Sequence, residues 1–119
     1  MTTSKTIREL LDRTRIRPVA DEAELQEALA TVLAAPELGV VREHVHGRNR
    51  FDFWIEQTGI VIEAKIQGSR NELIRQLHRY AEIDIVREVV VVTTKLQLRV
   101  HMMLAGKPVS TIWVGGGAL

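Results

Sequence analysis

The chain has 119 residues, a length that suits one domain with a single hydrophobic core. It contains no cysteine, which excludes disulfides, thiolate metal sites and cysteine nucleophiles, and none of its apolar runs is long enough to cross a membrane. Basic residues exceed acidic ones by only 16 to 15, so the overall charge does not indicate a nucleic-acid partner. We therefore expect a soluble, cytoplasmic protein.

Charge is unevenly distributed along the chain. Residues 1–20 carry five basic and two acidic side chains, whereas residues 21–39 carry five acidic side chains and no basic one. We predict a basic helical segment over residues 1–20 and the main domain over residues 21–119, together forming one globular unit.

Two helices are predicted before the first strand. Apolar residues recur at helical spacing over residues 4–13, with Ser4 as a candidate N-cap, and Pro18 interrupts the helical pattern. Asp21 is the expected N-cap of the second helix, and Glu24 follows at the position that a capping box requires.

The apolar period then changes from helical to alternating, which predicts three consecutive strands over residues 40–46, 50–55 and 60–66. Alternation in the second of these strands places Phe51, Phe53 and Ile55 on one face. A helix is expected from Ser69 to about Ile83, because Ser69 and Glu72 form a second capping-box pattern.

Four consecutive valines, residues 89–92, predict a strand that is covered on both faces and lies parallel to its neighbour. Residues 95–105 fit both a helical and an alternating pattern. We favour a helix because Gly106 and Pro108 follow as stop signals, and a short strand is predicted over residues 111–114. The predicted class is α/β, with a mixed central sheet flanked by helices and a core in the order αβββαβ.

The predicted hairpin between the second and third strands brings two acids together. If Ile55 pairs with Ile60, Asp52 lies directly opposite Glu63 on the same face of the sheet. Lys65, two residues after Glu63, points to the same side. Adjacent carboxylates repel each other unless a cation lies between them, and Mg²⁺ is commonly held by one or two carboxylates together with water and phosphate. This combination favours phosphodiester hydrolysis.

At these residues the chain resembles the PD-(D/E)XK nuclease superfamily, which has a restriction-endonuclease-like fold. The resemblance rests on Asp52, ten intervening residues, and Glu63-Ala64-Lys65, with Phe51 where the superfamily's name has proline. Gln76 and Tyr80 in the following helix resemble the Gln-x-x-x-Tyr motif of the RecB-like and λ-exonuclease-like branch.

The resemblance implies a metal-dependent deoxyribonuclease that uses Mg²⁺, with Mn²⁺ as a substitute. Asp52 and Glu63 are the implied metal ligands, completed by Glu24 or, as second choice, Glu27. Lys65 is expected to assist the attacking water and Gln76 to position it. The candidate substrate contacts are Tyr80, Arg48, Arg50, Arg75 and Arg79.

The substrate geometry stays open among duplex, single strand, flap and four-way junction. We favour a structure-selective or weakly specific endonuclease, for which a homodimer suits the two strands of duplex DNA. Trp54 shares the predicted face of Asp52 and is either core or a platform for a base. The alternative function is a catalytically inactive nuclease-fold protein that binds nucleic acid or serves as an accessory subunit.

Overall fold

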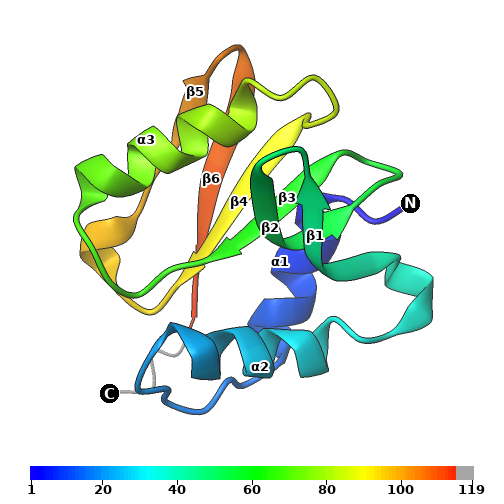
Figure 1. The fold of residues 1–119 in the computed structure, drawn as a ribbon. Helices are drawn as coiled ribbons and strands as arrows, with labels where there is room; N and C mark the ends of the chain where they lie inside the picture. The colour runs from blue at the N-terminus through cyan, green and yellow to red at the C-terminus, as the bar shows by residue number, and fades with distance from the viewer. Residues whose placement is uncertain (115–119) are drawn as a thin grey trace.

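A six-stranded mixed sheet forms the centre of the protein, with strand order β1-β2-β3-β4-β6-β5, in a computed structural model that describes residues 1–114 (Figure 1). The strands β3, β4 and β6 run parallel, whereas β1, β2 and β5 pair antiparallel with their neighbours. The elements are α1 (Ser4–Arg13), α2 (Glu22–Val32), the 3₁₀ turn η1 (Pro36–Leu38), β1 (Val40–His46), β2 (Asn49–Ile55), β3 (Ile60–Ala64), α3 (Arg70–Ala81), β4 (Glu88–Thr93), the 3₁₀ turn η2 (Leu96–Leu98), β5 (Met102–Leu104) and β6 (Lys107–Trp113).

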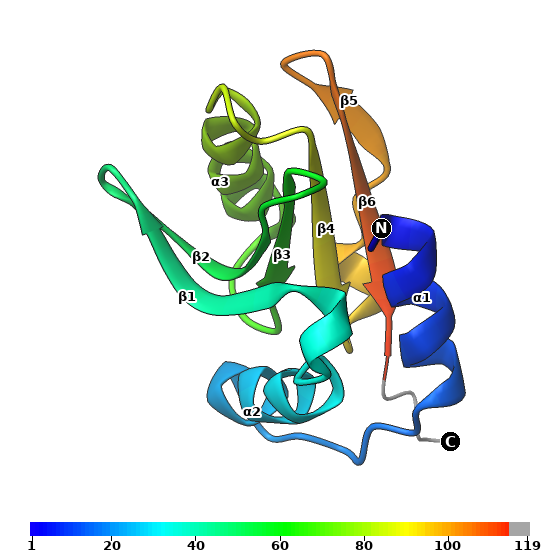
Figure 2. The same ribbon diagram turned by 90° about the vertical axis from the view of Figure 1, so that its right-hand side faces the viewer.

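The helices cover both faces of the sheet (Figure 2). On one face, α1 and α2 pack against residues such as Phe53, Ile62 and Val90, and on the other α3 packs against Val61 and Val91. The alternate valines of β4 therefore enter different cores, which confirms the prediction of a parallel strand buried on both faces. Within residues 1–114, no helix has the length and apolar composition of a membrane span.

Helix N-termini follow the sequence signals closely. Ser69 and Glu72 form the expected capping box of α3, and Asp21 accepts a hydrogen bond from the Glu24 amide at the start of α2. The N-cap of α1 is Thr3 and not Ser4, because the Thr3 side chain accepts from the Thr6 amide.

The predicted order αβββαβ is incomplete, and the helix expected over residues 95–105 does not form. This segment contains η2 and the short strand β5, which pairs with β6 at the edge of the sheet. In the strand that forms, Met102 and Leu104 pack against the core on the α3 side and Met103 is exposed, so the alternating pattern holds there, while Leu98 and Val100 reach the same core from the segment before the strand. Gly106, interpreted as a helix stop, instead closes the two-residue turn between Leu104 and Lys107.

A bend in the β1–β2 hairpin changes which residues face the core. Cα pairing holds from Val40↔Ile55 to Arg42↔Phe53 and resumes at His44↔Phe51. Between these stretches lies Glu43, with a φ of 56°. The predicted common face of Phe51, Phe53 and Ile55 is therefore wrong: Phe51 packs on the α3 side of the sheet, and the other two pack on the α2 side.

We expect the connection between β2 and β3 to tolerate no side chain at Gly59. This residue has a φ of +69°, and a Cβ there would lie 2.8 Å from the Arg87 Cγ and 2.9 Å from the Ile85 carbonyl oxygen. Gly106 has a similar φ of +77° but open space around it. Urea unfolding should show a loss of roughly 1 kcal/mol for Gly106→Ala and about 2 kcal/mol or more for Gly59→Ala. Equal losses would contradict the close approach at Gly59.

Candidate active site at the fork between β2 and β3

The regular pairing of β2 with β3 stops at Phe53↔Ile62, the pair next to the two predicted acids Asp52 and Glu63. Cα pairing runs from Ile55↔Ile60 to Phe53↔Ile62, which confirms the predicted register. Beyond it, the Ala64 amide donates to Asp52 Oδ2 at 2.8 Å. The Asp52 carboxylate thus accepts the hydrogen bond that a β2 carbonyl would accept in a continuous ladder. We call the point where β2 and β3 diverge beyond the Phe53↔Ile62 pair the fork.

Glu63 lies next to Asp52 inside this fork. The Asp52 amide and Glu63 Oε1 are 3.5 Å apart, so the two acids are neighbours as the register predicts. Glu63 is only 5% exposed, although it is an acid. The parallel strand β4 continues alongside, because the Lys65 amide donates to the Val92 carbonyl at 3.0 Å.

The Gln-x-x-x-Tyr pair of α3 connects the two branches of the fork. Gln76 Nε2 donates to Glu63 Oε2 at 3.0 Å and lies 3.0 Å from the Tyr80 hydroxyl. The Tyr80 hydroxyl in turn donates to the Arg50 carbonyl of β2 at 3.1 Å. Tyr80 is 5% exposed and packs edge-on against Phe51. Both side chains therefore support the fork from within, and the Tyr80 hydroxyl is directed to protein groups.

The surroundings of the two acids favour their protonated forms. Burial, followed by the charge of Asp52, raises the pKa of Glu63 to about 8. Burial also raises the pKa of Asp52, and the charge of Glu22 acts in the same direction. The hydrogen bond from Ala64 and the charge of Lys65 oppose this shift in Asp52 without cancelling it. The fork therefore holds two acids with incomplete compensation by cations.

The Glu22 carboxylate contacts both the Lys65 ammonium group and the backbone amides that follow β3. The Lys65 Nζ lies 3.9 Å from Glu22 Oε1, and the same oxygen accepts the amides of Ile66 at 3.0 Å and Gln67 at 2.9 Å. Glu22, the first residue of α2, thereby fixes the end of β3 and the lysine together.

The acid that α2 brings to the site is Glu22, whereas the sequence predicts Glu24. The Glu24 carboxylate turns back to the Ala20 amide at 2.7 Å and completes the helix cap. Residues two apart on a helix point in directions about 200° apart, so the two glutamates face different sides. The sequence places Glu22 directly after a helix cap, but it does not specify how the helix packs against β3.

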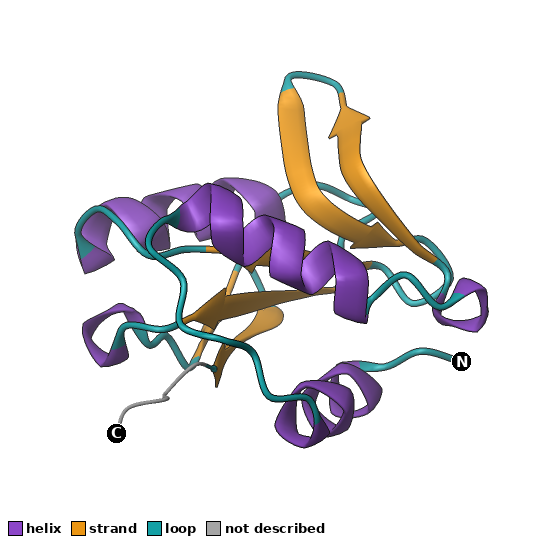
Figure 3. Cartoon of the chain, turned by 90° about the horizontal axis from the view of Figure 1, so that it is seen from below, coloured by secondary structure: helices purple, strands orange, loops and turns teal. Residues whose placement is uncertain are grey.

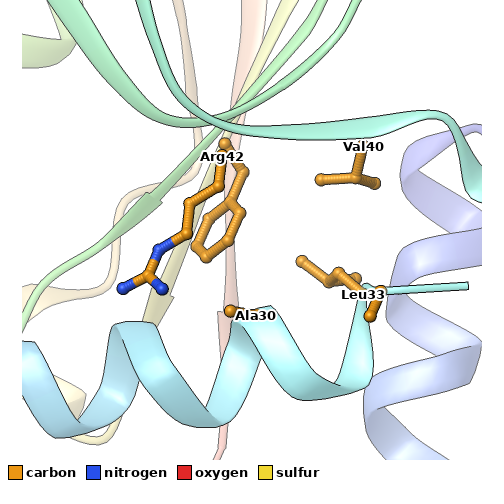
Figure 4. Close-up of a pocket in the computed structure, with 6 residues that line it drawn as sticks. Ala30, Leu33, Val40 and Arg42 are labelled. Atoms are coloured by element: carbon orange, nitrogen blue, oxygen red, sulfur yellow. The ribbon is translucent and has the colours of Figure 1, made fainter.

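Glu27, the second choice, forms an ion pair with Arg42 at 2.5 Å. Arg42 lines a mainly apolar cavity of about 260 Å³ between α2 and β1, beside Ala30, Leu33 and Val40 (Figure 4). Glu27 therefore belongs to that exposed ion pair and is not part of the fork.

The predicted DNA-contacting arginines occupy two surfaces. Arg48 and Arg50 are exposed on the β1–β2 hairpin, where Arg50 forms an ion pair with Glu43, and Arg75 and Arg79 are exposed on α3. Trp54 is 2% exposed and stacks against His44 with ring centroids 5.7 Å apart. Trp54 is therefore part of the core and does not offer a platform for a base.

Within residues 1–114, no three His, Asp or Glu side chains are grouped closely enough to hold a metal ion. Asp52 and Glu63 form a donor pair. Two carboxylates suit Mg²⁺, which usually keeps several water ligands, better than they suit zinc, which takes three or four protein ligands.

Comparisons of the chain with protein-family models, with curated proteins and with solved structures find no match. The fold and the site define an α/β protein with a mixed six-stranded sheet and two adjacent acids at a fork between strands. Function must therefore be inferred from the geometry of the site.

We expect the metal-free protein to lose stability as the pH rises from about 5 to 8. Glu63 has a higher pKa in the folded state than the ordinary glutamate value of 4.5, so over this range the folded chain retains a proton that the unfolded chain releases. In EDTA, Glu63→Gln should raise the melting temperature at pH 8 by about 5 °C or more and flatten the pH dependence. The exposed Glu37→Gln should follow the wild type. A Glu63→Gln variant that melts below the wild type at pH 8 would contradict this electrostatic account.

Proposed function

We propose that this protein is a Mg²⁺-dependent deoxyribonuclease that hydrolyses phosphodiester bonds at the fork between β2 and β3. The observation that carries the proposal is the meeting of Asp52, in the middle of β2, with Glu63, near the end of β3, beside Lys65. Burying two neighbouring acids costs stability, and a divalent cation would offset that cost.

The donor set fits a hard cation with oxygen ligands. Asp52 and Glu63 would hold Mg²⁺, or Mn²⁺ in its place, and the remaining ligand positions would be left for water and a phosphate oxygen. When bound, such a cation neutralises charge on the phosphate and lowers the pKa of a water ligand.

Lys65 supplies positive charge next to the acids. Its ammonium group donates hydrogen bonds, which orients the attacking water and stabilises the charge that develops on phosphorus-bound oxygens. In hydrolysis the water loses a proton to solvent as its oxygen bonds to phosphorus, one bridging P–O bond breaks, and the leaving oxygen receives a proton from solvent. Glu22 is a positioning residue in this scheme, because it anchors Lys65 and the backbone after β3 with one carboxylate oxygen.

Gln76 acts through Glu63. Its amide occupies one carboxylate oxygen of Glu63, which fixes the orientation of this side chain. Tyr80 holds the β2 backbone at Arg50 and so maintains the opening of the fork. Both are positioning residues, with Asp52, Glu63 and Lys65 as the groups that face metal, water and substrate.

The element order from β1 to β4 also supports a restriction-endonuclease-like core. Three antiparallel strands are followed by α3 and a parallel strand β4, which is the part of the order αβββαβ that the resemblance implies from its first strand onward. The small donor set favours one alternative, a nuclease-fold protein that binds nucleic acid without cutting it. Cleavage assays separate the two functions.

We expect metal-dependent cleavage that requires Lys65. Labelled duplex, single-stranded, flap and four-way-junction DNA should be incubated with Mg²⁺, Mn²⁺ or EDTA. Lys65→Ala and Asp52→Asn should each lower the cleavage rate by about 100-fold or more, because they remove charge that acts in the transition state. The exposed Lys5→Ala of α1 is the matched control and should cut like the wild type. No cutting by the folded wild type would overturn the proposal in favour of the binding protein.

Two glutamates of α2 should behave differently. Glu22→Gln should lower kcat roughly tenfold with KM unchanged, because the anchor of Lys65 loses its charge. Glu24→Gln should keep wild-type kcat and unfold more easily by about 1 kcal/mol, because it weakens a helix cap. The reverse pattern would restore Glu24 as the acid of the site.

A further inference from the structure

The β1–β2 hairpin projects from the sheet as an arm (Figures 2 and 3). We define the hairpin arm as residues 43–50, from the bend at Glu43 through the two-residue loop Gly47-Arg48 to Arg50. Asp52 lies only two residues beyond the arm, and the Tyr80 hydroxyl holds the Arg50 carbonyl at 3.1 Å. The arm is therefore fixed next to the two acids.

Several side chains of the arm are exposed to solvent, and two of them are arginines. Val45 is 64% exposed, and Arg48 at the tip is exposed as well. The Arg50 side chain is 66% exposed and pairs with Glu43, whose side chain is 48% exposed. Exposed ion pairs contribute little to stability, so this arginine can exchange its carboxylate partner for a phosphate at small cost.

The surface near the site does not suit single strands. Proteins that bind single-stranded nucleic acid stack bases on exposed aromatic rings. Phe51 and Trp54, at the base of the arm, are 0% and 2% exposed. Within residues 1–114, the exposed large aromatic side chain is Trp113 on β6, which β2, β3 and β4 separate from the arm's first strand.

We propose that the hairpin arm enters the major groove of duplex DNA next to the phosphate that is cut. Four residues of a strand span about 13 Å, and a B-form major groove about 12 Å wide and 8.5 Å deep admits a two-stranded ribbon. Arg48 and Val45 contact base edges, and Arg50 leaves Glu43 for a backbone phosphate. This inference rests on the proposed nuclease function and assigns duplex DNA as its substrate.

Two substitutions on the arm should change affinity in opposite directions. Arg48→Ala removes a groove contact and should weaken binding of duplex DNA about fivefold or more. Glu43→Gln removes the competing carboxylate of Arg50 and should tighten binding about twofold or more. Arg87→Ala removes another exposed arginine, beside Gly59 at the opposite end of β3, and should leave affinity unchanged.

Fluorescence anisotropy with a fluorescein-labelled DNA duplex, its single strand and the matching RNA duplex in EDTA measures these affinities without cleavage. The DNA duplex should bind most tightly, because the major groove of A-form RNA is too narrow for the arm. Tighter binding of the single strand or of duplex RNA would overturn the inference. So would equal affinities of Arg48→Ala and Arg87→Ala.

Cleavage of the same DNA duplex with Mg²⁺ separates this inference from the proposed function. Binding that depends on Arg48, without any cleavage by the wild type, would retain the arm and reject the nuclease. If Arg48→Ala cleaves at the wild-type rate when the duplex concentration is below KM, the nuclease function stands and the proposed role of the hairpin arm in binding duplex DNA is rejected.

Discussion

The hydrogen bond from the Ala64 amide to the Asp52 carboxylate is the contact on which the site depends. A backbone amide of β3 would ordinarily pair with a carbonyl of β2, but the part of β2 that precedes Phe53 diverges from β3. The carboxylate fills that place in the ladder, which brings an acid into the sheet beside Glu63. The separation of the two strands therefore allows Asp52 to lie beside Glu63.

Other parts of the fold maintain this opening. The bend at Glu43 directs the hairpin away from the sheet, and Tyr80 fixes the departing strand through the Arg50 carbonyl. Gln76 reaches Glu63 from α3 on one side, and Glu22 reaches Lys65 from α2 on the other. Helices on both faces of the sheet therefore converge on a few polar groups at one end of β3. Under the proposed nuclease function, this convergence would hold the charged groups in place for the reaction at a cost to stability.

Local signals in the sequence were sufficient for the elements that build the fork. The β2–β3 register followed from the alternation of apolar residues and the short loop, and the start of α3 followed from Ser69 and Glu72. These features depend on neighbours along the chain or on one hairpin partner, so they can be predicted from a single sequence.

The errors arose where tertiary packing decides. Residues 95–105 carry both periodicities, and pairing with β6 selects the strand. Glu43 gives no local signal of its positive φ, so the sequence does not predict the change of face at Phe51. The choice of Glu22 over Glu24 depends on how α2 packs against the end of β3.

Isothermal titration calorimetry with Mn²⁺ tests the central claim most directly, because Asp52 and Glu63 are proposed to bind a divalent cation. We predict binding to the wild type at pH 7 with release of about one proton, since Glu63 must ionise to bind. Binding should be lost in Asp52→Asn and Glu63→Gln and retained in Glu37→Gln. A wild type that binds no Mn²⁺, or variants of the two acids that bind it equally well, would contradict the assignment of this fork as a metal-dependent active site.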